Sequence, residues 1–315
     1  MEGRFYSDSP KVDYDDLPEL AGFTEEPQGM YVGCPGKHGY LKLVFELDKN
    51  GKSIMSDKDR RAPLIVQSEM YYDEGMPGIP QVYIQSSGGP NVDGDRFWQE
   101  FLLKKGAMAH ITTGAATKIA VMKSNYSGMR QLLTLEAGSS LEYIPEPIIP
   151  SRDARYVSDT SIEIDPTATL FYSEIYMPGR KYHKEGELFQ YDLLSICAHA
   201  HRPGGERLFR EKFVIRPKKK SVRALGIMGG FDVFANAVIL APPDKAEIIA
   251  SNIEPAWDPD RKLAYGVSSL PNKAGLLFKA LAMEPGPAKK LVREVCGLVR
   301  MAVKGRPLPP EYPWR

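Results

Sequence analysis

Short runs in which apolar and polar residues alternate dominate the chain from Tyr40 to about Leu240. Period-two alternation rich in β-branched and aromatic residues, broken by Gly, Pro, Asn and Asp, is typical of β-strands. The clearest examples are residues 40–47, 81–85, 161–165 and 209–215. We therefore predict a mainly β protein.

Three segments of this region resemble one another: residues 103–112, 135–144 and 164–173. Each has an aliphatic residue, a tight turn, small residues and a new apolar strand, and successive copies are offset by 32 and 29 residues. A period near thirty favours stacked β units that bury their apolar faces against neighbouring units. A hairpin-rich β protein would produce similar look-alikes, so this alternative remains open.

Helical periodicity is concentrated near the C-terminus. Residues 272–283 carry apolar side chains at helical spacing, and a second stripe starts after Pro287, while a shorter helix is expected over residues 244–251. The predicted fold is a superhelical, β-helix-like stack of short strands with a few helices, two of them near the C-terminus. Residues 1–30 are predicted to form an irregular arm, and residues 31–315 a single domain.

Composition narrows the function classes. With 41 Lys and Arg against 40 Asp and Glu, the chain lacks the basic excess that nucleic acids or anionic membranes require. Three scattered cysteines predict no disulfide framework, which fits a reducing cytoplasm. No run of residues is long and apolar enough to predict a membrane span. Motifs for a serine nucleophile, a phosphate-binding loop and a zinc protease are likewise missing.

One candidate metal site follows from the sequence Cys-Ala-His-Ala-His at residues 197–201. On an extended strand, alternate residues project to one face, so His199 and His201 would form an imidazole-rich surface beside Cys197. An Arg-Pro-Gly-Gly turn follows immediately. The pattern is therefore equally that of a strand entering a hairpin.

Two carboxylates share strand faces with apolar residues. Glu211 alternates with Phe209 and Phe213, and Glu174 shares its face with Leu170 and tyrosines. A buried carboxylate binds a cation, pairs with Arg or Lys, or changes its pKa. Ion pairing with an arginine such as Arg155 or Arg180 is the structural alternative to a cation site.

Five segments together resemble the urease accessory protein D family, called UreD or UreH. They read FYSEIYMPGRKYH at residues 171–183, GPNVDGD at 89–95, AHITTGAATK at 109–118, LEYIPEPIIP at 141–150 and LLFKAL at 276–281. The likeness runs in order over residues 35–315.

The resemblance implies a non-enzymatic chaperone that binds apo-urease with accessory proteins F and G and helps to deliver nickel. It also implies a β superhelix and an internal passage for nickel(II) in transit, with no tightly bound cofactor. By motif, the acids of this passage are Asp95, Glu142, Glu174 and Glu211. Oxygen ligands hold a divalent ion weakly and release it readily, as conduction requires.

The C-terminal residues are expected to contact accessory protein F. Apolar stripes there exceed what a cap for a β stack needs, which makes Leu291, Val295 and Trp314 candidate anchors. Two rival interpretations remain: a β-helical hydrolase with paired catalytic carboxylates, and a purely structural scaffold whose acids are buried ion pairs.

Overall fold

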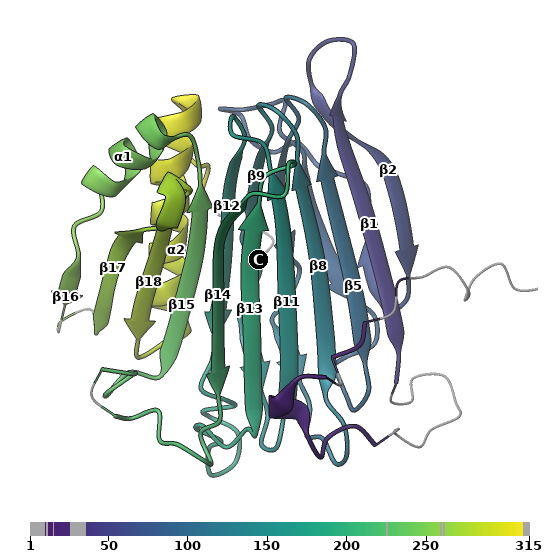
Figure 1. The fold of residues 1–315 in the computed structure, drawn as a ribbon, viewed down its shortest axis with the longest axis vertical. Helices are drawn as coiled ribbons and strands as arrows, with labels where there is room; N and C mark the ends of the chain where they lie inside the picture. Colours follow the sequence, from purple (N-terminus) through teal and green to yellow (C-terminus); the bar gives the residue numbers. More distant parts are fainter. Residues whose placement is uncertain are drawn as a thin grey trace, which may run out of the picture.

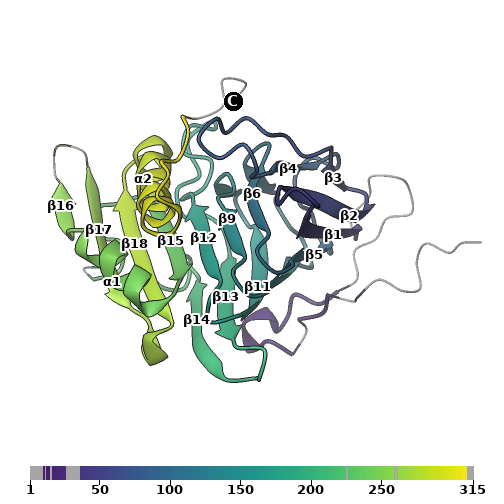
Figure 2. The ribbon, with the colours of Figure 1, turned by 90° about the horizontal axis from the view of Figure 1, so that it is seen from above.

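The computed structural model describes residues 10, 12–14, 16–25, 36–224, 226–258, 260 and 262–310. Its strands form two mixed sheets that face each other, with both α-helices beside the larger sheet (Figures 1 and 2). The predicted mainly β class is confirmed. Because both sheets contain antiparallel as well as parallel pairs, the superhelical stack itself stays a prediction.

The smaller sheet has seven strands in spatial order, with β14 and β2 at its edges. Its strands are β14 (Arg207–Ile215), β13 (Leu193–His201), β11 (Arg155–Ile164), β8 (Ser127–Leu135), β5 (Arg96–Leu103), β1 (His38–Leu47) and β2 (Ser53–Arg61).

The larger sheet has eleven strands and extends further on the side of β16. Nine strands lie along its main path: β16 (Ala256–Asp258), β17 (Leu263–Ser269), β18 (Gly275–Ala282), β15 (Val233–Leu240), β12 (Thr169–Tyr176), β9 (Ser140–Tyr143), β6 (Met108–Thr113), β4 (Gln81–Ser86) and β3 (Leu64–Val66). Two short strands, β10 (Ile148–Pro150) and β7 (Thr117–Ile119), pair beside this path. Apolar side chains from both sheets form the core between them.

Successive copies of the predicted repeat lie side by side in adjacent parallel strands. Leu103 lies opposite Leu135, and Leu135 lies opposite Ile164, in three adjacent strands of the smaller sheet. The larger sheet repeats the same steps, because Met108, Ser140 and Thr169 are neighbours in β6, β9 and β12. The offsets of 32 and 29 residues found in the sequence are therefore the registers of two neighbouring parallel pairs in each sheet.

The prediction of two helices near the C-terminus is wrong for residues 272–283, which contain the 3-10 turn η2 (Pro271–Lys273) and strand β18. Apart from Lys279, β18 carries apolar residues on both faces, so its sequence lacks the alternation of a strand with one face in solvent. Backbone pairing with β15 and β17 decides the outcome. Gly275 begins the strand at φ +145°, where an added Cβ would lie 2.0 Å from the Ile239 oxygen.

The two α-helices pack on the outer face of the larger sheet. The predicted helix over residues 244–251 is confirmed as α1 (Pro243–Ser251), and the stripe after Pro287 lies on α2 (Pro285–Lys304). Figure 2 shows α2 against β15 and β18, on the side away from the smaller sheet. Neither helix, nor any other helix in the described ranges, is long and apolar enough to cross a membrane.

Part of the predicted N-terminal arm is packed against the smaller sheet. The 3-10 turn η1 (Pro18–Leu20) lies within it. Val12, Tyr14 and Leu20 are buried against Tyr126 and its neighbours. The Tyr126 hydroxyl oxygen accepts a hydrogen bond from the main-chain N–H of Tyr14 at 3.1 Å. This contact ties the arm to the loop before β8.

Candidate functional site between the sheets

Polar side chains form a row on the inner face of the smaller sheet. Gln99, Gln131 and Thr160 are direct neighbours in β5, β8 and β11, and their side chains point toward the larger sheet. The Gln131 amide donates to Gln99 at 2.8 Å, and the Thr160 hydroxyl donates to Gln131 at 3.0 Å. Since each position follows the last by one repeat, the repeat places these three polar residues side by side in neighbouring strands.

The larger sheet supplies the facing half of this arrangement. Tyr143 and Tyr172 stack with ring centroids 5.3 Å apart. Across the gap, the Tyr143 hydroxyl accepts a hydrogen bond from the Gln131 amide, and the Tyr172 hydroxyl donates one to the Gln131 oxygen. Farther along, Glu174, Asn236 and Lys279 are direct neighbours in β12, β15 and β18. We call these eight residues with Glu211 the intersheet track: Gln99, Gln131, Tyr143, Thr160, Tyr172, Glu174, Glu211, Asn236 and Lys279.

Glu174 is the buried carboxylate of the track that has no cation beside it. Only 5% of the residue is exposed, and no described Lys, Arg or His forms an ion pair with it. Burial raises the pKa of Glu174 to about 7, although the hydroxyls of Tyr176 and Tyr172 oppose this shift. The expected arginine pairs are not found: Arg155 pairs with Asp192, and Arg180 with Glu187.

Glu211 lies where the track leaves the space between the sheets. As predicted, it shares its strand face with Phe209 and Phe213, and it is partly buried. Its carboxylate forms an ion pair with Lys279 and accepts a hydrogen bond from the Asn236 amide at 3.2 Å. The other amide atom of Asn236, Oδ1, is buried with no hydrogen-bond partner among the described residues. Such an orphaned acceptor indicates room for water or a bound donor.

The structure does not bring Asp95 into the track. Its carboxylate accepts main-chain N–H groups of Lys37 and Val92, both at 2.9 Å, and lies 3.0 Å from the Lys37 ammonium. The residue is fully buried at the turn before β5. These contacts neutralise the charge and give Asp95 a turn-stabilising position.

Glu142 points to the opposite face of the larger sheet, because the adjacent residue Tyr143 points into the track. The Arg300 guanidinium on α2 donates to both oxygens of the Glu142 carboxylate, at 2.6 and 2.5 Å, and His110 Nδ1 lies 2.8 Å from Glu142 Oε2. Burial alone would raise the pKa of Glu142, but the hydrogen bonds from Arg300 and His110 outweigh it and lower the pKa to about 2. Asp73 completes this buried cluster with a second ion pair to Arg300.

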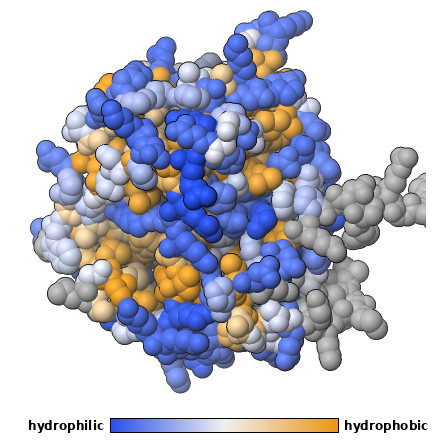
Figure 3. All heavy atoms as spheres, in the orientation of Figure 1, coloured by the Kyte–Doolittle hydropathy of each residue, from blue (hydrophilic) through white to orange (hydrophobic). Residues whose placement is uncertain are grey.

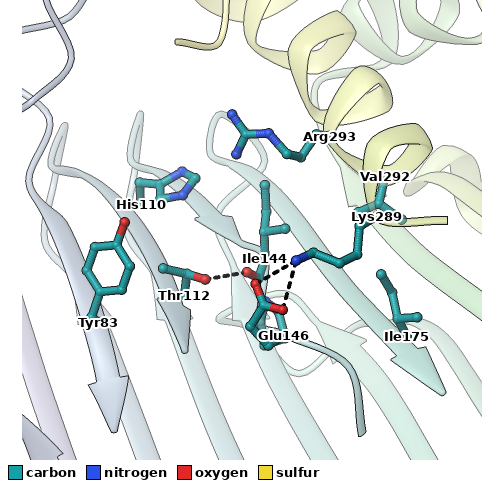
Figure 4. A pocket seen from close by; sticks show the side chains of 10 residues that line it. Tyr83, His110, Thr112, Ile144, Glu146, Ile175, Lys289, Val292 and Arg293 are labelled. Atoms are coloured by element: carbon teal, nitrogen blue, oxygen red, sulfur yellow. Dashed lines mark hydrogen bonds and ion pairs between the residues drawn. The ribbon is translucent and has the colours of Figure 1, made fainter. Parts of the chain in front are cut away.

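A small hollow adjoins this cluster beneath α2 (Figure 4). Lys289 reaches down from the helix to Glu146 at 2.9 Å, and Thr112 donates to the Ile144 carbonyl at 2.7 Å. The ion pair between Lys289 and Glu146 joins α2 to the loop after β9 at this hollow.

His199 and His201 lie on the outer face of the smaller sheet, as the alternation predicts. Each imidazole has one carboxylate nearby: Asp159 at 3.6 Å from His199, and Glu163 at 3.4 Å from His201. Burial lowers the pKa of His199. Among the described residues, no group of three or more His, Cys, Asp or Glu side chains is arranged to hold a metal ion.

Two of the predicted partner contacts are core residues. Leu291 and Val295 are buried between α2 and the larger sheet, with 4% and 3% of each residue exposed. The side of α2 that faces solvent carries other residues, including Met301. Trp314, the third predicted contact, lies outside the described residues.

Sequence reasoning missed seven members of the track: Gln99, Gln131, Thr160, Tyr143, Tyr172, Asn236 and Lys279. A signal for the first three was present, because residues 99, 131 and 160 are related by the same offsets of 32 and 29 as the repeat. Asn236 and Lys279 had no such signal, since β15 and β18 run antiparallel to their neighbours outside the repeat.

Comparison with known proteins gives consistent relatives over almost the whole chain. A family described as UreD urease accessory protein matches residues 37–315. "Urease accessory protein UreD 2" of Brucella suis biovar 1 (strain 1330) is 45% identical over 296 residues, covering 94% of this chain and 98% of the relative. "Urease accessory protein UreD" of Yersinia enterocolitica serotype O:8 is 40% identical over 304 residues, covering 95% and 93%.

Proposed function

The chain belongs to the UreD urease accessory protein family, and from this premise we propose that it acts in urease maturation without being an enzyme. It binds apo-urease together with accessory proteins F and G, and it helps nickel(II) to reach the urease active site. Family membership supports the role in maturation. The finer steps rest on the track between the sheets.

We propose that nickel moves along the intersheet track and that the parallel arrays enclosing it are coils of a β superhelix. Glu174 carries this proposal, because an unpaired buried carboxylate is costly unless a cation or a proton neutralises it. Amide, hydroxyl and carboxylate oxygens are weak ligands for a borderline cation, so each site would release it again.

Hollows lie at both ends of the track. A cavity of about 540 Å³ is lined by Gln99 at one end, and it also contains Asn91, whose amide nitrogen is buried without a hydrogen-bond partner among the described residues. At the other end, Lys279 lines a groove of about 630 Å³. A polar row that joins two hollows suits ion transfer better than a closed scaffold of ion pairs.

The test measures urease activity, at limiting nickel, in cells that express the Glu174→Gln variant. This substitution keeps the side-chain shape and removes the charge. We expect activation to fall roughly tenfold, since a lost attraction of about 1.4 kcal/mol changes binding by that factor. Co-purification with the accessory proteins and urease should persist. Glu163→Gln, a half-exposed acid on the outer face, is the matched control and should activate normally.

Normal urease activation by Glu174→Gln at limiting nickel would contradict the proposal that nickel moves along the intersheet track. Loss of the accessory complex would assign Glu174 to assembly in place of ion transfer. Turnover of a small substrate by the isolated chain would contradict the non-enzymatic role itself.

A further inference from the structure

The larger sheet extends past the edge of the smaller one. β14 is the last strand of the smaller sheet, and it packs over β15 and β18 through Phe213, Phe234 and Glu211. Beyond β14, the larger sheet continues with β17 and β16. Figure 1 shows these strands to the left of β14 with no strand in front of them.

A groove of about 630 Å³ occupies this place. Its floor is the inner face of β17 and β18, including Ala264, Gly266 and Leu281, and residues 220–222 and 226–228 also line it. Val214 on β14 and Ile227 are 43% and 46% exposed at its rim. Figure 3 shows apolar atoms gathered in this region, at the left of the view. An apolar hollow beside an unpaired strand edge is the arrangement used for strand addition.

Gly266 is a second sign of close approach by another chain. It lies in the interior of β17, directly opposite Lys279, so a side chain at this position would project into the groove. Its φ is ordinary, and an added Cβ would meet only the Pro255 Cβ at 3.7 Å. The fold therefore does not require glycine here. A glycine inside a strand without such a requirement often marks a site where a ligand or another backbone comes near.

The charge of the groove selects its occupant. Its described lining includes three cations, Arg216, Lys220 and Lys279, and no acid. Lys279 is paired with Glu211, and Arg216 donates to the Glu19 carbonyl, but Lys220 has no acidic partner among the described residues. Lys219 beside it is equally unpaired there. A partner rich in Asp or Glu would satisfy these ammonium groups.

We propose that an extended, acidic segment of a partner protein adds to the smaller sheet along the edge of β14 beyond Leu208, since the Arg207 and Leu208 carbonyls already accept hydrogen bonds from the Asn272 amide. A strand placed there, about 4.8 Å from β14, would lie over the inner face of β17 and β18. Its inward side chains, small or apolar, would fill the space above Gly266 and Leu281. Its outward acids would face Lys220 and the exposed cations of β14. This inference does not depend on nickel transfer.

The test uses a phage-displayed library of random nine-residue peptides selected on the full-length chain. We expect enriched peptides to alternate apolar residues with Asp or Glu. Their fluorescently labelled forms should bind about tenfold more weakly to Gly266→Leu, which fills the groove. Gly204→Leu is the matched control, because Gly204 also has an ordinary φ and open space but lies in the β13–β14 turn.

Charge reversal and amide hydrogen exchange distinguish strand addition at β14 from other modes of peptide binding. Lys220→Glu should weaken an acidic peptide about tenfold, and a lysine-substituted version of the peptide should regain binding to that variant. Peptide binding should slow amide exchange in β14. Each of four results would overturn the proposal: no enrichment, equal binding to Gly266→Leu, helical peptides that leave β14 unprotected, or a dimer of the chain that Gly266→Leu dissociates.

Discussion

Arg300 on α2 and Glu142 on β9 form a two-point ion pair across the seam between helix and sheet, with both side chains buried. The planar guanidinium matches both carboxylate oxygens, which fixes the orientation of α2 as well as its distance from the sheet. His110 and Asp73 add one contact to each partner. The acid that the family resemblance placed on the nickel path thus has a structural position.

Removing one member of this pair should destabilise the protein severely. Arg300→Met leaves two buried carboxylates without their arginine, and Glu142→Gln leaves the buried guanidinium with Asp73 as its one acidic partner among the described residues, so each should lower the free energy of unfolding by about 3–5 kcal/mol. Urea unfolding followed by circular dichroism measures this change. Lys290→Ala removes an exposed pair with Glu294 at 3.9 Å and should cost less than about 1 kcal/mol. Equal effects of buried and exposed variants would contradict the assigned role.

The same pair predicts a loss of stability in acid. The pKa of Glu142 is lowered from 4.5 to about 2, so its stabilising contribution is complete above pH 4.5 and disappears as the pH falls toward 2. The difference in unfolding free energy between the wild type and Glu142→Gln should shrink over this window. Melting curves of both proteins between pH 6 and pH 2.5 measure it, and a constant difference would exclude Glu142 as the titrating group.

Two features show how much of the architecture could be predicted from the sequence. The offsets of 32 and 29 residues could be recognised because parallel pairing places equivalent positions of the sequence repeat opposite each other in adjacent strands. Strand β18 was mistaken for a helix because Leu276, Phe278 and Ala280 face α2 while Leu277 and Leu281 face inward. An apolar run covered on both faces has no period, and only its neighbouring strands decide its structure.

The candidate site divides in the same way. Glu174 and Glu211 stood out in the sequence because local alternation places them on apolar strand faces. The pairing of Glu142 with Arg300 joins residues 158 positions apart and leaves no local signal. Sequence therefore identified the acids, while their division between a polar track and an ion-paired seam required the tertiary structure.

Neutralising Glu174 should stabilise the protein at alkaline pH. Its pKa is raised from 4.5 to about 7, so ionisation costs stability progressively as the pH rises from 4.5 through 7. Glu174→Gln should therefore melt like the wild type at pH 4.5 and be more stable at pH 8, by up to about 3 kcal/mol. Destabilisation at pH 8 would reveal a cation partner for this carboxylate.

Two glycines in neighbouring strands should respond oppositely to alanine. Gly275→Ala places a methyl group 2.0 Å from the Ile239 oxygen at a positive φ, so strands β15 and β18 must separate locally. We expect a loss of more than about 2 kcal/mol. Gly266→Ala meets no close atom and should be neutral or stabilising by up to about 1 kcal/mol. Thermal melting of the two variants compares them directly, and similar destabilisation of both would contradict the open space at Gly266.

The solvent-facing side of the two helices should bind accessory protein F. Leu291 and Val295 cannot test this, because charging either one would destroy the core beneath α2. Ile248 on α1 and Met301 on α2 are 47% and 48% exposed, so aspartate there leaves the core intact. We expect Ile248→Asp with Met301→Asp to melt normally and to lose co-purification with accessory protein F, since charge is disfavoured in an apolar interface core. Val121→Asp, at a residue 51% exposed in the loop after β7, is the control. Normal capture of the partner by the double variant would exclude this surface.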